Sequence, residues 1–232
     1  MTNSLFLLVT DLLAYFMLFV LCWVSTLNSS NSIQDVLRGE GSFVHINLKH
    51  FISILIIVVL FFWHLDHDLS VTSPFIMINR YLIWIVPVPV ILVLYISLCS
   101  KIPGINEKLN PYSNSQCIFY ILLRIIYLVS YEIFFRNLLL NSLVHSFNIP
   151  VAIITSSLLY CLIHAINRRI EFLLSLPFGI LLAWLTIETL SIYPAIILHL
   201  LLSVPFELRS FNYLNKPMYG KDILNWSNRL HW

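Results

Sequence analysis

The chain has 232 residues, of which 59% are hydrophobic and only 10% are charged, and its mean hydropathy is +0.87. One soluble core could not bury this much apolar surface, so the composition predicts an integral membrane protein and excludes a sizeable soluble domain. The net charge of +2 comes from residues dispersed among the loops. It therefore indicates no nucleic-acid partner.

Long unbroken runs of Leu, Ile and Phe indicate helices rather than the alternating strands of a membrane barrel. Seven such segments lie at about 4–27, 50–65, 81–100, 117–144, 150–166, 170–189 and 192–208. They predict an all-α fold, a polytopic membrane bundle of about seven transmembrane helices in a single domain over 1–232. The segment 50–65 is the shortest and runs into polar residues, so a re-entrant segment is the alternative there.

Lysine and arginine are distributed unequally between the two sides of the predicted bundle. If all seven segments cross, Arg80 is alone on one face, and ten other basic residues share the opposite face. The positive-inside rule then places the N-terminus outside and the C-terminus in the cytoplasm of a cell inner (plasma) membrane. The tail 209–232 carries aromatic residues among its bases and is predicted to be cytoplasmic or interfacial.

The fourth segment contains charged side chains within its apolar run. An ionisable group costs about 2.5–3.5 kcal/mol at the centre of a membrane helix, so it is retained where it faces the bundle interior and finds a partner. Glu132 and Arg136 are four residues apart and share one helical face. Arg124 is expected to snorkel to the cytoplasmic edge, which places Glu132 about 12 Å deeper.

Two later segments repeat this four-residue spacing of polar groups. Tyr160 and His164 lie in one, and His199 and Ser203 lie in the other. If the three pairs converge, a carboxylate and an imidazole can act as general base on one water, and the remaining imidazole and hydroxyl can donate to an oxyanion. The spacing thus predicts hydrolysis by general acid–base catalysis, with a purely structural ion pair as the alternative.

These motifs carry a resemblance to a known family. The runs 132–136, 160–164 and 199–203 resemble, in this order, the motifs EExxxR, FxxxH and HxxxN of the CAAX protease and bacteriocin-processing (Abi) family of intramembrane glutamic proteases. The family-like core covers about 117–208. The resemblance implies an intramembrane peptidase that cleaves a membrane-anchored or lipidated peptide or protein in the lipid bilayer, without a cofactor.

The resemblance also implies a role for each matched residue. Glu132 would be the catalytic base or its support, and Arg136 would hold it in place. His164 would orient the water, while His199 with Ser203 would stabilise the oxyanion.

The chain departs from the family pattern at its first motif. The family has two adjacent glutamates there, and the first is the one usually assigned to activating water. Tyr131 occupies that position here, so Glu132 matches the second glutamate. The alternative function is therefore a catalytically inactive relative that acts as a peptide-binding, immunity or regulatory membrane protein.

Other polar residues suggest rival interpretations. Glu132, His164 and His199 could form a two-histidine, one-carboxylate zinc set, but no HExxH motif occurs and Arg136 would oppose a dication. A proton-coupled transporter would use the same groups, although the chain shows no repeated halves. Asp11 is expected either to join the site or to lie in the outer leaflet, and His64 to belong to a solvated loop at the membrane edge.

Overall fold

A computed structural model describes residues 2–27, 33–38, 41–65, 86–100, 113–166 and 169–214. Within these ranges every regular element is a helix, which confirms the predicted all-α fold. The helices in chain order are α1 (Thr2–Leu27), α2 (Ile33–Arg38), α3 (Phe43–Leu65), α5 (Pro87–Cys99), α6 (Asn114–Glu132), the π-helix η1 (Ile133–Leu139), α7 (Leu140–Ser146), α8 (Ile149–Ala165), α9 (Arg169–Thr189) and α10 (Tyr193–Leu214).

The predicted apolar segments correspond to these helices. Five helical runs are long and apolar enough to cross a membrane, namely α1, α3, the run α6–η1–α7, α9 and α10. The helices α5 and α8 are apolar but have only 13 and 17 residues. The described chain is thus a multi-pass membrane protein built as a helical bundle. Residues 81–85 of the third predicted segment and 215–232 of the predicted tail lie outside the described ranges, whereas 209–214 continue α10.

Helix α3 corrects the predicted segment at 50–65. It begins at Phe43 and has 23 residues, enough for a complete span rather than a short re-entrant one. The predicted segment began at His50, because Lys49 and the polar residues just before it make 43–49 look like a loop when hydropathy alone is considered. The Lys49 side chain is buried in the bundle, at 6% exposure, and the helix includes it.

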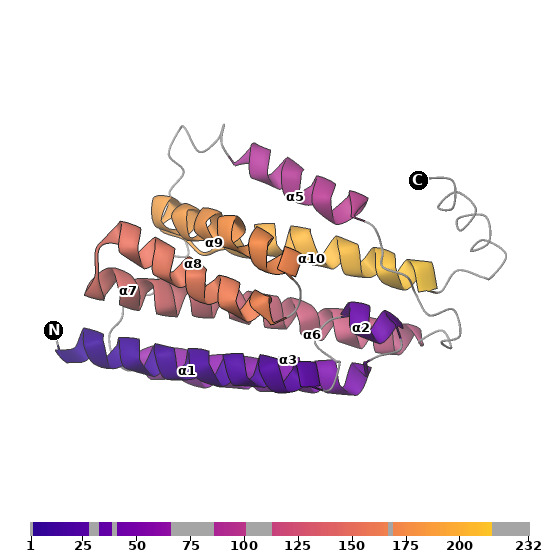
Figure 1. The fold of residues 1–232 in the computed structure, drawn as a ribbon, viewed down its shortest axis with the longest axis horizontal. Helices are drawn as coiled ribbons and strands as arrows, with labels where there is room; N and C mark the ends of the chain where they lie inside the picture. The colour runs from indigo at the N-terminus through magenta and orange to yellow at the C-terminus, as the bar shows by residue number, and fades with distance from the viewer. Residues whose placement is uncertain are drawn as a thin grey trace.

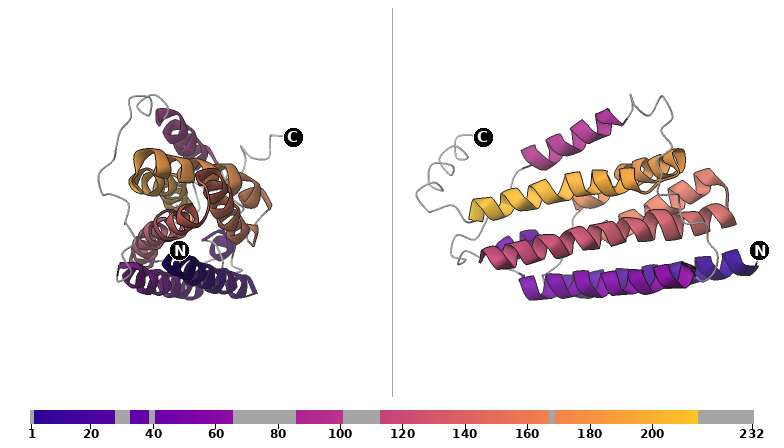
Figure 2. Two further views of the ribbon diagram at one scale, coloured as in Figure 1. Left: turned by 90° about the vertical axis from the view of Figure 1, so that its left-hand side faces the viewer. Right: turned by 180° about the vertical axis from the view of Figure 1, so that it is seen from behind.

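The helices run roughly along the long axis of the molecule (Figure 1). α1 and α3 lie side by side at one face, and the continuous rod α6–η1–α7 packs against them (Figure 2). On its other side the rod contacts α8, α9 and α10, while α5 packs against α10. The rod is therefore central, and its polar residues meet helices from both sides.

Aromatic side chains surround the middle of this rod. The ring of Phe135 meets Tyr15 of α1 and Tyr160 of α8 edge-on, at centroid distances of 6.3 and 5.4 Å. Gly179 of α9 lies against Tyr160, where an added Cβ would be 3.2 Å from a ring carbon. A small residue at this point lets the two helices approach closely. Tyr160 is thus fixed from two sides.

A buried polar cluster joins α1, α3 and α7. Ser142 Oγ donates to Asp11 Oδ2 over 2.5 Å, and Asp11 Oδ1 lies 3.1 Å from His64 Nε2. The three side chains are at most 2% exposed. The prediction that His64 lies in a solvated loop is therefore wrong, because α3 continues to Leu65 and turns this imidazole inward. Asp11 is fully buried and connects α1 with α3 and α7.

Candidate functional site

The junction of α6 and η1 positions the first predicted pair. Glu132 is the last residue of α6 and Arg136 lies in η1. A π-helical turn carries an extra residue and frequently occurs at functional sites, because it re-aims the side chains next to it. Arg136 Nε donates to Glu132 Oε2 over 3.1 Å, and both side chains are fully buried. The two residues form an ion pair in the interior of the bundle.

The other carboxylate oxygen contacts α10. Glu132 Oε1 lies 2.5 Å from His199 Nδ1. An ionised carboxylate only accepts hydrogen bonds, so we assign the hydrogen to Nδ1 of the imidazole. The carboxylate is thereby shared between a guanidinium and an imidazole, and only Nε2 of His199 is left for another partner.

The charges in this buried group determine what His199 offers. One carboxylate and one guanidinium already balance, and a further unpaired charge in the interior would cost several kcal/mol. A neutral His199 therefore costs least. With its hydrogen on Nδ1, the neutral ring presents a lone pair at Nε2, which is the form required of a general base.

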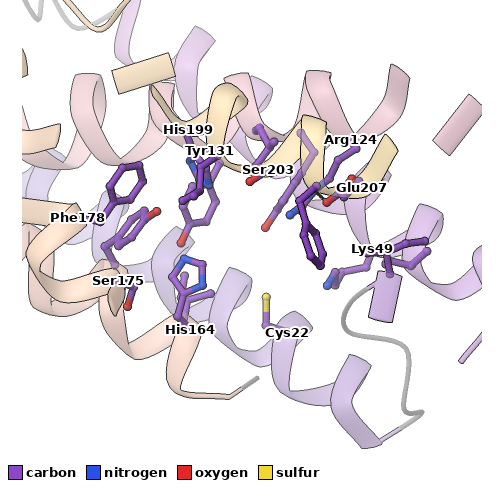
Figure 3. Close-up of a pocket in the computed structure, with 18 of the residues that line it drawn as sticks. Cys22, Lys49, Arg124, Tyr131, His164, Ser175, Phe178, His199, Ser203 and Glu207 are labelled. Carbon is purple, nitrogen blue, oxygen red and sulfur yellow. Dashed lines mark hydrogen bonds and ion pairs between the residues drawn. The ribbon is translucent and has the colours of Figure 1, made fainter. Parts of the chain in front are cut away.

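A cavity of about 290 Å³ opens beside this group (Figure 3). Its lining includes the predicted site residues His164, His199 and Ser203. Glu132 and Arg136 are not among the lining residues, so the carboxylate reaches the cavity only through His199. The sequence predicted a carboxylate and two imidazoles around one water; the structure brings the two imidazoles to the cavity and keeps the carboxylate behind one of them.

Tyr131 lines the cavity next to these imidazoles. Its hydroxyl points toward His164 (Figure 3), and its ring centroid lies 6.5 Å from that of His164 and 6.0 Å from that of His199. Within the described part of the chain, Tyr131 Oη and His164 Nε2 are buried and have no hydrogen-bond partner. Buried polar atoms are nearly always paired, so these two atoms indicate a place for water or a ligand.

Tyr160 contacts residues of two predicted motifs, its own and the first. Its ring centroid lies 4.9 Å from that of the His164 imidazole in a tilted arrangement, and the guanidinium carbon of Arg136 lies 5.0 Å from its ring centre. A cation over an aromatic face is attracted by the ring quadrupole. Tyr160 thus holds the His164 ring and the Arg136 side chain in a fixed relation.

A second ion pair at the same cavity was missed by the sequence interpretation. Arg124 Nε donates to Glu207 Oε1 over 3.0 Å, and both residues line the cavity together with Lys49. Arg124 was predicted to snorkel to the cytoplasmic edge of the membrane; its side chain is 22% exposed and pairs with Glu207. The signal available in the sequence was Glu207 itself, an acid eight residues after His199 in the same helix.

The rival zinc set is not assembled. Among the described residues there is no group of three or more His, Cys, Asp or Glu side chains that could hold a metal ion. Both oxygens of Glu132 are engaged by Arg136 and His199. The site as built is a carboxylate–imidazole pair facing a second imidazole and a phenol.

One comparison with known protein families found a match. Residues 113–204 match the family model described as type II CAAX prenyl endopeptidase Rce1-like. This match confirms the resemblance predicted from the three motifs, and it includes every predicted site residue. No curated protein matched the chain, and no solved structure matched it.

Proposed function

We propose that this chain, with its segment similar to CAAX prenyl endopeptidases, hydrolyses a peptide bond of a membrane-anchored or lipidated protein or peptide. The observation that carries the proposal is the position of His199. Its Nδ1 is bound to the buried Glu132 carboxylate, and its ring lines a cavity shared with His164. A water molecule in that cavity could donate to Nε2 of His199, whose other ring nitrogen is bound to the Glu132 carboxylate.

Glu132 and Arg136 serve as positioning residues in this proposal. The carboxylate fixes the tautomer and the orientation of the imidazole and stabilises the imidazolium that forms during proton transfer, as carboxylates do in other carboxylate–histidine pairs. Arg136 keeps that carboxylate ionised and in place. The family resemblance allows two roles for Glu132, the catalytic base or a residue that positions the base. The geometry favours the second role, with His199 as the base.

The proposed reaction uses four groups of the cavity lining. His199 Nε2 accepts a proton from water while the water oxygen attacks the carbonyl carbon. The hydroxyls of Tyr131 and Ser203 donate to the oxygen that becomes negative, and His164 orients the attacking water. The proton held by His199 then passes to the leaving nitrogen, and the C–N bond breaks. No covalent intermediate is formed.

The apolar part of the lining fits a lipid-anchored substrate. Leu174, Phe178, Leu202 and Phe206 lie in the same cavity as the two imidazoles. Ligand sites are typically lined by apolar side chains with a few polar groups that fix orientation. A peptide with aliphatic side chains or a prenyl group would bury apolar surface here and present its backbone to His199.

The second candidate function is a catalytically inactive relative that binds a membrane peptide. Tyr131 favours it, because a phenol replaces the glutamate to which the family's water activation is usually assigned. In this case the cavity and its polar groups would hold a peptide without cleaving it, as an immunity or regulatory protein would.

Cleavage of a prenylated peptide by the purified full-length protein in lipid vesicles separates the two functions. We expect cleavage by the unmodified protein and a loss of at least about 100-fold in kcat for His199→Ala. His145→Ala is the matched control, because His145 is exposed at the end of α7. Peptide binding without cleavage by the unmodified protein would establish the inactive relative instead.

We also propose the placement of the chain in its membrane. The multi-pass bundle would lie as one domain in a cell inner (plasma) membrane, with the N-terminus outside and the C-terminus in the cytoplasm. The asymmetry of lysine and arginine between the two faces supports this orientation. Fusing a reporter that is active on only one side of the membrane to each terminus would test it.

A further inference from the structure

We propose that Asp11, His64 and Ser142 form a buried proton-binding site, which makes the packing of α1 and α3 against α7 depend on the uptake of one proton. This inference is independent of the proposed peptidase activity. Asp11 and His64 precede the matched segment 113–204, and none of the three side chains lines the cavity. The site is therefore separate from the candidate functional site.

The imidazole of His64 carries its hydrogen on the nitrogen that faces the backbone. Nδ1 lies 2.9 Å from the carbonyl oxygen of Leu60, one turn earlier in α3. A carbonyl oxygen only accepts hydrogen bonds, so we assign the hydrogen to Nδ1. In the neutral ring, Nε2 then presents a lone pair and has no hydrogen to donate.

This second nitrogen of His64 faces a carboxylate. Nε2 lies 3.1 Å from Asp11 Oδ1, and within the described residues neither atom has another hydrogen-bond partner. An ionised carboxylate also only accepts. Without a further proton, two acceptor atoms would therefore meet in the interior. One added proton makes the contact attractive, either as an imidazolium beside a carboxylate or as a neutral imidazole beside a carboxyl group.

The burial of Asp11 leads to the same number of protons. Its side chain is 0% exposed, and a carboxylate buried without a cation is strongly unfavourable. Ser142 donates one hydrogen bond to Oδ2 but brings no charge. In the part of the chain that the structure describes, the only ion-pair partner of Asp11 is His64. The cluster is therefore neutral with one added proton and carries a charge of −1 without it.

Other titratable groups on the helices around the site have different surroundings. On α1 the nearest is Tyr15, whose hydroxyl donates to the backbone carbonyl of Leu159. The charged groups and histidines of the packed helices are His45, Lys49 and His50 of α3, Arg124 and Glu132 of α6, Arg136 of η1, His145 of α7 and His164 of α8.

None of these charged groups or histidines replaces His64 as the partner of Asp11. His45 and His145 are exposed. Lys49 and His164 line the cavity. Arg136 binds Glu132, and Arg124 lies between Glu207 and His50. On α3, His50 is fourteen residues before His64, which is about 21 Å along the helix axis.

The proton contributes to the assembly of the bundle because the site joins three helices. Helices α1 and α3 supply Cys22 and Lys49 to the cavity lining, and the cluster holds both helices against the rod. When the pH rises and the proton leaves, a buried charge without a partner faces a lone pair. The unfolded chain pays no such penalty, so the free energy of unfolding should fall as the pH rises.

Asp11→Asn tests the proton directly. The amide has the shape of the carboxyl group; its oxygen can accept from Ser142 and its NH₂ can donate to His64 Nε2 without an added proton. The folded unmodified protein should therefore hold one proton more than the folded variant. In the unfolded chain Asp11 is ionised above about pH 4 and adds no proton.

We expect the ratio of the unfolding constants, unmodified protein over Asp11→Asn, to rise with pH. One proton corresponds to a change of up to about tenfold per pH unit between about pH 5 and 8. Denaturant titrations of the full-length proteins in detergent micelles measure both constants. His145→Gln is the matched control, because its exposed imidazole has no buried partner to lose, and the corresponding ratio should not change with pH.

His64→Gln is a second variant that keeps the test decisive if Asp11→Asn folds poorly. Its amide can donate to the Asp11 carboxylate without an added proton. The ratio of the unfolding constants, unmodified protein over His64→Gln, should rise above about pH 6.5, where the imidazole of the unfolded chain is neutral. Below that pH the ratio should stay constant, because the unfolded histidine then binds a proton as well.

Two results would overturn the proton site. The first is a ratio that stays constant over the whole pH range for both Asp11→Asn and His64→Gln. The second is a pH dependence that disappears when a chelator is added, which would assign the contact to a metal ion between imidazole and carboxylate. Unfolding is the measured quantity, so absence of cleavage by the unmodified protein would contradict the proposed function without affecting this site.

Discussion

Glu132 and His199 are 67 residues apart in the chain, yet Oε1 of the carboxylate lies 2.5 Å from Nδ1 of the imidazole. The contact joins the end of α6 to the second turn of α10, and the other carboxylate oxygen of Glu132 is bound by Arg136. The two residues therefore form one unit, in which the imidazole faces the cavity and the carboxylate supports it.

We predict that substitutions in this unit are not additive. Glu132→Gln removes the charge that supports the imidazole, and His199→Ala removes the ring itself, so each should lower kcat by about 10²–10⁴-fold. The double variant should be little worse than His199→Ala alone, because groups that act as one unit lose their effect together. Single-turnover cleavage of a prenylated peptide measures this. Losses that multiply in the double variant would show that the two residues act independently.

Tyr131 offers a second prediction through its hydroxyl. Tyr131→Phe keeps the ring packing and removes one donor from the cavity, and removal of an oxyanion donor lowers kcat by about 10²–10³-fold. KM should change much less, because the interaction is made mainly in the transition state. A pure rise in KM would instead place the hydroxyl in substrate binding.

The substitution Tyr131→Glu would restore the two adjacent glutamates of the family's first motif. The substitution places a second carboxylate beside the cavity, near His164 and His199. If the phenol is the cause of an inactive state, Tyr131→Glu should create cleavage activity that the unmodified protein lacks. If the chain is active through His199, the new charge should lower activity, because it disturbs the balanced charges of the buried group. The same cleavage assay distinguishes the two results.

Arg136 should be important for stability. Arg136→Met leaves the Glu132 carboxylate buried without its ion-pair partner, and breaking such a pair costs about 3–5 kcal/mol. The free energy of unfolding, measured by denaturant titration in detergent micelles, should fall by this amount. Glu132→Gln combined with Arg136→Met should recover most of it, since no unpaired charge remains. Equal destabilisation in the single and double variants would contradict the prediction.

The hydrogen bond from Ser142 of α7 to Asp11 of α1 should contribute to the free energy of unfolding and should not affect the rate of cleavage. Ser142→Ala leaves one oxygen of the fully buried Asp11 without its donor, which costs about 1–3 kcal/mol. Because the cluster lies outside the cavity lining, the cleavage rate per folded molecule should stay unchanged. Ser115→Ala at the exposed start of α6 is the control. A changed cleavage rate in Ser142→Ala would connect this cluster to the site.

Much of the bundle followed from local patterns in the sequence. The apolar runs predicted the helices, because a segment that buries its backbone polar groups in lipid must be helical over its length. The four-residue spacing placed Glu132 beside Arg136, because residues i and i+4 share a helical face. In the same way it indicated His164 and His199 as the polar groups of their helices.

The predictions of helix bounds and loops were wrong where a polar residue was assigned to a loop because of its low hydropathy alone. Lys49 concealed the first turns of α3, and His64 was predicted to lie in a loop. Both side chains are buried in the bundle, and Asp11 of another helix contacts His64 there. The hydropathy of a local segment contains no information about a side chain of another helix that pairs with its polar residue.

The sequence by itself determined that the chain is a helical membrane protein, because helical period and hydrophobicity are local properties. It also predicted Glu132, His164 and His199 as candidate site residues from their spacing. Only the tertiary structure decided that Glu132 contacts His199 from the side away from the cavity, that the Tyr131 hydroxyl points toward His164, and that Arg124 pairs with Glu207. These relations depend on the rotation and depth at which α6, α8 and α10 pack. Packing is fixed by contacts between residues far apart in the chain, such as Gly179 against Tyr160, which no local pattern contains.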